Sequence, residues 1–147
     1  MGNSPSTPTA FESCLNSALP ASAISVPGDL FYHSFAVKPY NLAYDDITPA
    51  AVVRPKTTEE VSRVVRCATD NAIKVQARSG GHSYGDYSIG GQSGSLIVDM
   101  VNFQQFSYDR TTERAIIGSG TLLGDLTQRL HDAAPEGRAM GHGLCPQ

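Results

Sequence analysis

The sequence predicts one domain of the α+β class, built from mixed helices and strands. Two helical stripes of apolar residues and four short strand-like runs, all within residues 51–133, support this prediction. The length of 147 residues suits a single ordinary domain. Hydrophobic residues make up 40% and charged residues 17%, which is typical of a globular protein and argues against disorder over most of the chain.

Residues 1–50 are expected to form an irregular lead-in to this domain. Proline at positions 5, 8, 20, 27, 39 and 49 interrupts any long regular element. Aromatic residues of this segment are expected to pack against the domain that follows. They are Phe31, Tyr32, Phe35, Tyr40 and Tyr44. The domain itself is expected to occupy residues 51–147.

The first predicted elements of the domain are a strand and a helix. Residues 51–53 form a short apolar run that Pro55 closes, as expected of a buried strand. Thr57 and Glu60 have the spacing of a capping box, which predicts that a helix begins there. An apolar stripe at the helical period predicts one buried face of this helix. The stripe comprises Val61, Val64, Val65, Ala68 and Ala72.

Three further strands and a second helix are predicted downstream. Strict alternation over residues 73–78 indicates a strand with one buried face. Residues 96–98 predict a third strand, and residues 114–118 predict a fourth after a turn at residues 109–112. A second apolar stripe predicts a helix, with Asp125 early enough to favour the helix dipole. This stripe comprises Leu122, Leu123, Leu126, Leu130 and Ala133.

The turn Ser79-Gly80-Gly81-His82-Ser83 follows the second strand and is the main candidate for a cofactor site. A strand-helix-strand unit is normally right-handed and parallel, and ligands gather at the carboxyl ends of its strands. Glycines let main-chain N–H groups approach an anion closely, so the turn can form a pyrophosphate cradle, while the histidine offers a ring nitrogen. The alternative is an ordinary tight turn between two strands. The flanking Arg78 and Tyr84, together with a cysteine downstream, favour the cofactor site.

A second glycine-rich run partly matches a nucleotide-binding fingerprint. Gly118, Gly120 and Gly124 follow a predicted strand and open a predicted helix. The third glycine is one place late, and too little sequence follows to place the acidic ribose partner expected about 20 residues on. We therefore interpret this run as a strand-to-helix turn, with the helix start a candidate neighbour of cofactor phosphates.

Cys145 is the second candidate reactive group, in the segment Gly-His-Gly-Leu-Cys-Pro-Gln. Irregular backbone there would let the sulfur face a ligand, and His142 could serve as the positive or hydrogen-bonding neighbour that promotes thiolate character. One alternative is a buried, unreactive cysteine. Another is a zinc site made by His142 and Cys145 with His82 or His131, but four ligands in two close pairs are usual and only one pair is present. We expect no metal.

Charge and hydropathy exclude two classes of partner. A net charge of −3 and a pI near 5.7 provide no basic surface for nucleic acid. No apolar run approaches the roughly 20 residues of a membrane span. The first ten residues lack the basic start and apolar middle of a secretory signal.

The two candidate segments together resemble the FAD-binding (PCMH-type) domain of the vanillyl-alcohol-oxidase superfamily, in the branch of berberine-bridge enzymes and fungal oligosaccharide oxidases. The resemblance runs from about residue 51 to the last residue and includes residues 94–99 and 118–125. It implies a strand-helix-strand subdomain plus the start of a second mixed α/β subdomain, incomplete. In that branch the histidine carries the 8α carbon of FAD and the cysteine carries the C6 carbon, which implies bicovalent attachment through His82 and Cys145.

The resemblance also implies an activity. Such oxidases oxidise a sugar hemiacetal or an alcohol, giving a lactone from a reducing sugar, and reduce O2 to H2O2. The tyrosine at the Tyr84 position lines the sugar side of the flavin. The expected catalytic base lies outside this chain, and no residue here is assigned that role. Two alternatives are an FAD-linked oxidase of secondary metabolism and a non-catalytic, truncated flavin-binding remnant.

Three cysteines leave one unpaired after any disulfide. We favour a disulfide between Cys14 and Cys67, because Cys67 projects off the predicted helical stripe and because flavin attachment would need Cys145 as a free thiol. A disulfide implies an oxidising compartment, and the resembled fungal oxidases are secreted, so an extracellular location is expected. The alternative is that Cys14 and Cys67 are buried thiols.

Overall fold

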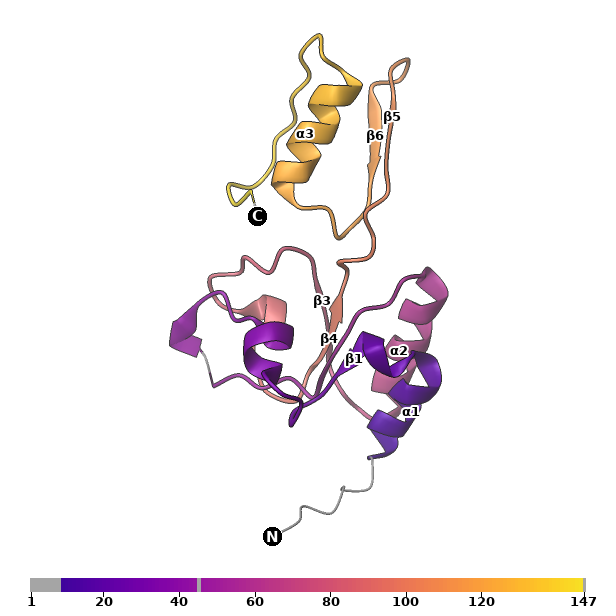
Figure 1. Ribbon diagram of the computed structural model, residues 1–147, viewed down its shortest axis with the longest axis vertical. Helices are drawn as coiled ribbons and strands as arrows, with labels where there is room; N and C mark the ends of the chain where they lie inside the picture. Colours follow the sequence, from indigo (N-terminus) through magenta and orange to yellow (C-terminus); the bar gives the residue numbers. More distant parts are fainter. Residues whose placement is uncertain (1–8, 45, 147) are drawn as a thin grey trace.

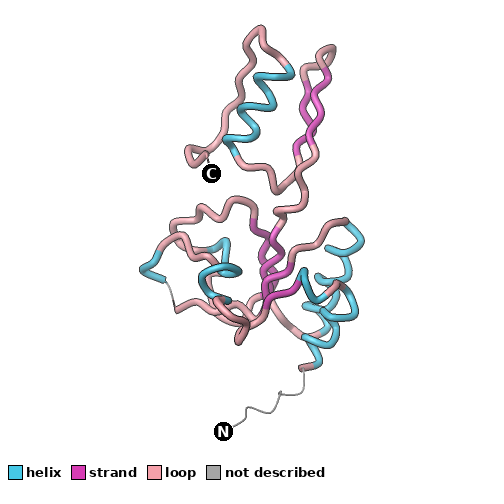
Figure 2. The backbone as a smooth tube through the Cα atoms, viewed as in Figure 1, coloured by secondary structure: helices cyan, strands magenta, loops and turns pink. Residues whose placement is uncertain are grey.

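The computed structural model describes residues 9–44 and 46–146 and has the predicted mixture of helices and strands. Figure 1 shows a larger part with a sheet flanked by helices α1 and α2, and a smaller part with a β-hairpin and helix α3. The tube in Figure 2 shows how much of the chain between these elements is loop. No helix among the described residues is long and apolar enough to cross a membrane.

The larger part is built on a four-stranded sheet with strand order β1-β2-β4-β3. Its strands are β1 (Ile24–Ser25), β2 (Ala51–Val53), β3 (Val75–Arg78) and β4 (Leu96–Asp99). Strands β2 and β3 both pair in parallel with β4, whereas β1 pairs antiparallel with β2. The predicted parallel crossover from β2 to β3 is therefore confirmed, with β4 between the two strands.

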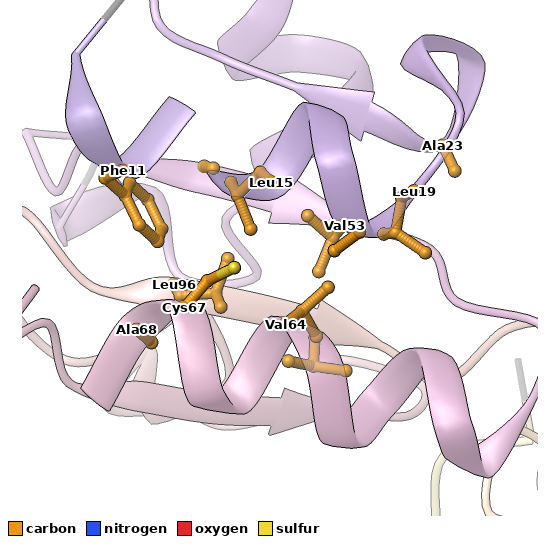
Figure 3. Close-up of a cluster of buried hydrophobic side chains, with 12 residues drawn as sticks. Phe11, Leu15, Leu19, Ala23, Val53, Val64, Cys67, Ala68 and Leu96 are labelled. Carbon is orange, nitrogen blue, oxygen red and sulfur yellow. The ribbon is translucent and has the colours of Figure 1, made fainter. Parts of the chain in front are cut away.

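Alternating side chains of the central strands fill two separate cores, because successive residues of a strand point to opposite faces. Val53 and Leu96 belong to the core beneath α1 and α2, which Figure 3 shows in close-up. Val52 and Ile97 belong to a second core on the opposite face, made with residues of the lead-in and Ile89. The sheet is thus covered on both sides, which explains why its central strands are apolar up to Asp99 at the end of β4.

Helices α1 (Ala10–Ala18) and α2 (Thr58–Asp70) cover one face of the sheet. The side-chain oxygen of Thr57 accepts from the N–H of Glu60 at 3.2 Å, as the predicted capping box requires. The Glu60 carboxylate, however, accepts from the N–H of Lys56 at 2.6 Å, so it reaches one residue further back than predicted. The predicted disulfide joins the two helices at Cys14 and Cys67.

The smaller part contains β5 (Phe106–Asp109), β6 (Arg114–Ile117) and α3 (Leu123–Ala133). Strands β5 and β6 form an antiparallel hairpin, and α3 packs beside β5 (Figure 1). Gly118 donates to the carbonyl of Gln105 at 2.7 Å, and Gly120 donates to that of Phe103 at 2.9 Å. These bonds hold together the two chain segments that enter and leave the hairpin.

Glycine is required at position 120 because another backbone lies against it. A Cβ built there would stand 1.9 Å from the carbonyl oxygen of Met100, and one built on Gly118 would stand 2.2 Å from that of Phe103. Such contacts with backbone cannot be relieved by a side-chain rotation. The glycine run that partly matches a nucleotide fingerprint therefore serves close packing between chain segments at these two positions.

The lead-in is more regular than the sequence analysis predicts. Its first described residues form α1, whose capping box is complete, since Thr9 and Glu12 each accept from the other's N–H group. Short 3₁₀ turns occupy Ala21–Ala23 and Leu42–Tyr44, and a π-helical turn occupies Tyr32–Val37. Pro20, Pro27, Pro39 and Pro49 fall between these elements, so they limit the length of each element without preventing it, and Pro5 and Pro8 lie outside the described residues.

Other predictions are wrong in detail. On α2, Val65 is 37% exposed and Ala72 lies beyond the helix end, whereas Cys67 is buried. The buried face is therefore rotated toward the disulfide. Strand β5 was not predicted. Of the lead-in aromatics, Phe31, Phe35 and Tyr40 are exposed, Tyr32 is buried in the second core, and the side chain of Tyr44 lies outside the described residues.

The disulfide should contribute strongly to stability because it closes a loop of 53 residues. Replacing both cysteines, Cys14→Ser with Cys67→Ser, should lower the free energy of unfolding by about 2–4 kcal/mol. Urea denaturation followed by circular dichroism measures this change, with Cys145→Ser as the control that should leave the midpoint in place. An unchanged midpoint in the double variant would show that the bridge does not stabilise this fold.

The glycine at position 120 gives a second stability prediction. Gly120→Ala should destabilise the fold by about 2 kcal/mol or more, because its new methyl group meets backbone. Gly141→Ala is the matched control, since a Cβ there meets nothing within 4 Å. Thermal melts of both variants make the comparison, and equal melting temperatures would contradict the packing account.

Candidate functional site

Arg78 ends β3 beside Asp99, the last residue of β4, and the two side chains form a buried ion pair. The Arg78 Nη2 atom lies 2.6 Å from Asp99 Oδ2 and also donates to the carbonyl of Ala36 at 2.8 Å. A second donor of the same guanidinium reaches the carbonyl of Val37. One side chain therefore joins both strand ends to the lead-in, directly before the glycine turn.

The turn at residues 79–83 lies at the carboxyl end of β3, where the crossover places it. Gly81 has a φ of 80°, a left-handed conformation that favours glycine. A Cβ on Gly80 would come within 2.8 Å of the His82 ring. The described part of the chain provides no hydrogen-bond acceptor for the main-chain N–H groups of Gly80, Gly81 and His82. Main-chain N–H groups without an acceptor, on glycines that have no side chain to block approach, are the features that an anion-binding turn needs.

The segment after the turn is anchored by Asp86, whose side chain is fully buried. Its Oδ1 atom accepts from the main-chain N–H groups of Tyr40 at 3.0 Å and Asn41 at 3.2 Å. The side chain of Asn41 donates in turn to the carbonyl of Tyr84 at 2.7 Å. Ser83 accepts from the N–H of Tyr87 at 3.2 Å, so its hydroxyl serves the next turn of the chain. These bonds fix Tyr40 against the turn.

One cavity of about 300 Å³ brings the two candidate reactive residues together. His82 lines it from the turn and Cys145 lines it from the C-terminal segment, 63 positions apart in the sequence. The other lining residues come from the turn, the start of α3 and the C-terminal segment. They are Ser79, Gly80, Thr121, Leu122, Leu123, Gly143 and Leu144.

A glycine in α3 positions the segment that carries Cys145. The N–H of Gly124 donates to the carbonyl of Pro146 at 2.8 Å. A Cβ on Gly124 would stand 2.8 Å from that same oxygen, so only glycine allows this approach. The third glycine of the run thus docks the Cys145-Pro146 segment against the first turn of α3.

The His82 ring is buried at both nitrogens, and neither has a hydrogen-bond partner in the described structure. Buried polar atoms normally find partners, so an orphaned imidazole beside a cavity points to a group that the described residues do not supply. The ring of Tyr40 packs edge-on against it, with ring centroids 5.2 Å apart. His82 therefore fits the role of a ligand or attachment residue for a bound molecule.

Cys145 is the free cysteine and is half-buried. Its Sγ atom lies 3.9 Å from the hydroxyl of Tyr40, and this contact raises the pKa of Tyr40 above its ordinary value. His142, expected as the neighbour of the sulfur, is exposed instead, with Nδ1 2.6 Å from the carbonyl oxygen of Gly143. Tyr40 therefore occupies the place predicted for His142. Sequence reasoning missed it because Tyr40 lies 105 positions from the cysteine.

A second cavity of about 200 Å³ shares the turn with the first. It is lined by the turn, the strand ends and the chain segments beside Gly120, and its lining includes Lys38 together with the Arg78–Asp99 ion pair. The ammonium group of Lys38 beside free main-chain donors suits phosphate oxygens. The residues present thus fit FAD, with an orphaned histidine and a free cysteine at one cavity and a cationic, glycine-lined cradle at the next.

Among residues 9–44 and 46–146, no group of three or more His, Cys, Asp or Glu side chains gathers as metal ligands. Tyr84 is 74% exposed beside Tyr40, with ring centroids 5.7 Å apart, so it faces the open side of the site.

Comparison with known proteins places this site in a family context. The sequence model of the FAD binding domain family matches residues 49–143. An FAD-linked oxidoreductase sorD of Penicillium rubens is 41% identical over 138 residues, covering 92% of this chain and 28% of the relative. A carbohydrate oxidase of Microdochium nivale is 37% identical over 138 residues, covering 93% of this chain and 27% of the relative.

Solved structures show the same architecture. The carbohydrate oxidase of Microdochium nivale, in complex with a substrate analogue, superposes with a TM-score of 0.79 at 36% identity, covering 94% of this chain and 28% of that chain. The BBE-like 1 protein of Physcomitrella patens superposes with a TM-score of 0.78 at 38% identity, covering 85% of this chain and 26% of that chain. The chain therefore spans less than a third of the length of these relatives.

The buried Arg78–Asp99 ion pair gives a prediction for the stability of the fold when its carboxylate is removed. Asp99→Asn should destabilise the fold by about 3 kcal/mol, because it leaves a buried guanidinium without its counter-charge. Glu113→Gln is the matched control: it removes the exposed pair with Arg138 and should leave stability unchanged. Urea denaturation measures both variants. Equal midpoints for Asp99→Asn and the parent would contradict the anchoring role.

Proposed function

The chain belongs to the FAD-binding domain family, and on that premise we propose that it forms the flavin-holding part of an FAD-linked carbohydrate oxidase. The observation that carries the proposal is that His82 and Cys145 line one cavity. Their approach depends on the fold, since the turn and the C-terminal segment belong to different parts of the structure. A pair of nucleophilic side chains facing one cavity suits attachment to a flat ring at two edges.

The residues of the site would each have a separate task. His82 and Cys145 would hold the flavin ring, while the N–H groups of Gly80 and Gly81 and the cation of Lys38 would hold the pyrophosphate. When bound, FAD would supply the two-electron oxidation of a sugar hemiacetal carbon to a lactone, with O2 as electron acceptor and H2O2 as product. The chain contributes binding and orientation.

Tyr84 is the proposed contact on the substrate side. Its ring is largely exposed beside the cavity, and aromatic faces provide platforms for sugar rings. Relatives named xylooligosaccharide oxidase and glucooligosaccharide oxidase are 35% and 37% identical, which supports a carbohydrate substrate. We assign no catalytic base within the 147 residues. The activity proposed here belongs to the longer protein that the relatives represent.

A second candidate is an FAD-linked oxidase of secondary metabolism. The 41% identity to sorD and the match to a reticuline oxidase of Papaver somniferum, 40% identical over 78 residues, favour this reading. Peroxide release from cellobiose or xylooligosaccharides by a protein carrying the remaining domains would support the carbohydrate oxidase, and silence on all sugars would favour the second candidate. If the chain binds flavin but no longer protein that contains it oxidises any substrate, it would be a non-catalytic remnant.

An extracellular location is part of the proposal. The Cys14–Cys67 disulfide lies in the core between α1 and α2 and would form in an oxidising compartment.

The proposal predicts covalent flavin on this chain. After incubation with FAD and acid precipitation, the yellow absorbance should remain with the pellet, because covalent bonds survive unfolding. His82→Ala and Cys145→Ser should each retain colour through the other link, and the double variant should lose it. His131→Ala serves as the control histidine on the exposed side of α3. A colourless pellet from the parent chain would overturn the proposal.

A further inference from the structure

Tyr40 contacts both residues that the proposed function assigns to flavin attachment. We propose that Tyr40 is the positioning residue of that attachment, with its hydroxyl holding and activating the Cys145 sulfur while its ring holds the His82 imidazole. This inference rests on the proposed function. Tyr40 comes from the lead-in, so it joins a segment outside the glycine turn and the C-terminal segment to the chemistry of both.

The geometry around Tyr40 supports a directed role. Its hydroxyl lies 3.9 Å from Cys145 Sγ, within hydrogen-bonding range for sulfur, and its ring centroid lies 5.2 Å from that of His82. Its main-chain N–H is bound to the buried carboxylate of Asp86 at 3.0 Å. This hydrogen bond holds the Tyr40 backbone beside the turn. From there the Tyr40 side chain reaches both the His82 imidazole and the Cys145 sulfur.

The chemistry of the sulfur explains what the hydroxyl would do. A thiolate, not a thiol, is the nucleophile, and a phenol O–H that donates to sulfur stabilises the thiolate. Either atom of this contact could donate, and the inference assigns the donor to the phenol, whose pKa the contact raises above its ordinary value. The other titratable groups facing this contact are His82 and Tyr84, while the Asp86 carboxylate lies behind the Tyr40 backbone.

The attachment at Cys145 balances with molecular oxygen as the oxidant. With FAD bound, an S–C bond would form between Cys145 Sγ and the C6 carbon of the flavin ring, and the S–H and ring C–H bonds would break. The two hydrogens leave as two protons and two electrons, which reduce O2 to H2O2. Tyr40 undergoes no net change in this balance, because it only donates a hydrogen bond to the sulfur.

Thiol alkylation tests the contact without any flavin. Under non-reducing conditions Cys14 and Cys67 stay paired, so iodoacetamide reports on Cys145 alone. Tyr40→Phe keeps the ring and removes the hydroxyl, and it should slow alkylation at neutral pH by about threefold or more. Tyr87→Phe is the matched control, because Tyr87 is 70% exposed and does not line the cavity, and it should react at the parent rate.

The pH dependence separates activation from simple packing. The rates of Tyr40→Phe and the parent should converge at alkaline pH, where the thiol is ionised in both proteins, and should be equal in denaturant. A difference that persists at alkaline pH would mean steric shielding. Either that result or equal rates at neutral pH would overturn the inference.

Flavin incorporation separates this inference from the proposed function. Mass mapping of the peptide that contains Cys145 should show slower flavin attachment in Tyr40→Phe than in the parent, with attachment in Tyr87→Phe unchanged. Equal incorporation in Tyr40→Phe and the parent would overturn the role of Tyr40 while the proposed function stands. A parent chain without covalent flavin would overturn the proposed function, and the alkylation rates would still decide the Tyr40–Cys145 contact.

Discussion

The buried ion pair between Arg78 and Asp99 is the interaction on which the site depends. It closes the ends of β3 and β4 and binds the carbonyls of Ala36 and Val37, so the sheet and the lead-in are held by one guanidinium. A charge pair of this kind costs desolvation and is maintained only with its full set of partners. Because Arg78 directly precedes the glycine turn, the position of His82 follows from this anchor.

Close contacts between main-chain segments determine the position of the hairpin, of α3 and of the C-terminal segment that carries Cys145. Gly118 and Gly120 let the segments entering and leaving the hairpin pair with each other, and Gly124 lets the Cys145-Pro146 segment dock on α3. Each glycine therefore acts by the absence of a side chain at a contact with main chain. The cavity between the two parts is a product of both constraints, and both the His82 imidazole and the Cys145 sulfur line it.

Short patterns in the sequence predicted the features that are determined by residues close together in the chain. The capping residue Thr57, the parallel crossover and the turn at the carboxyl end of β3 all follow from short-range spacing, and the structure has them. The role of Tyr40 and the purpose of Gly124 could not be predicted in this way, because each depends on a partner far along the chain. Strand β5 alternates half-buried aromatic residues, Phe106 and Tyr108, with exposed polar ones, which is a strand pattern that the sequence analysis overlooked in so short a run. Thr9 and Glu12 have the spacing of a capping box, but the many prolines in this segment led to a prediction of irregular structure.

The central claim is that one flavin ring joins two distant side chains. The most direct measurement is mass spectrometry of the FAD-treated chain after denaturation and proteolysis. The account predicts a single cross-linked species in which one flavin connects the peptide containing His82 to the peptide containing Cys145. Recovery of both peptides without flavin would contradict it.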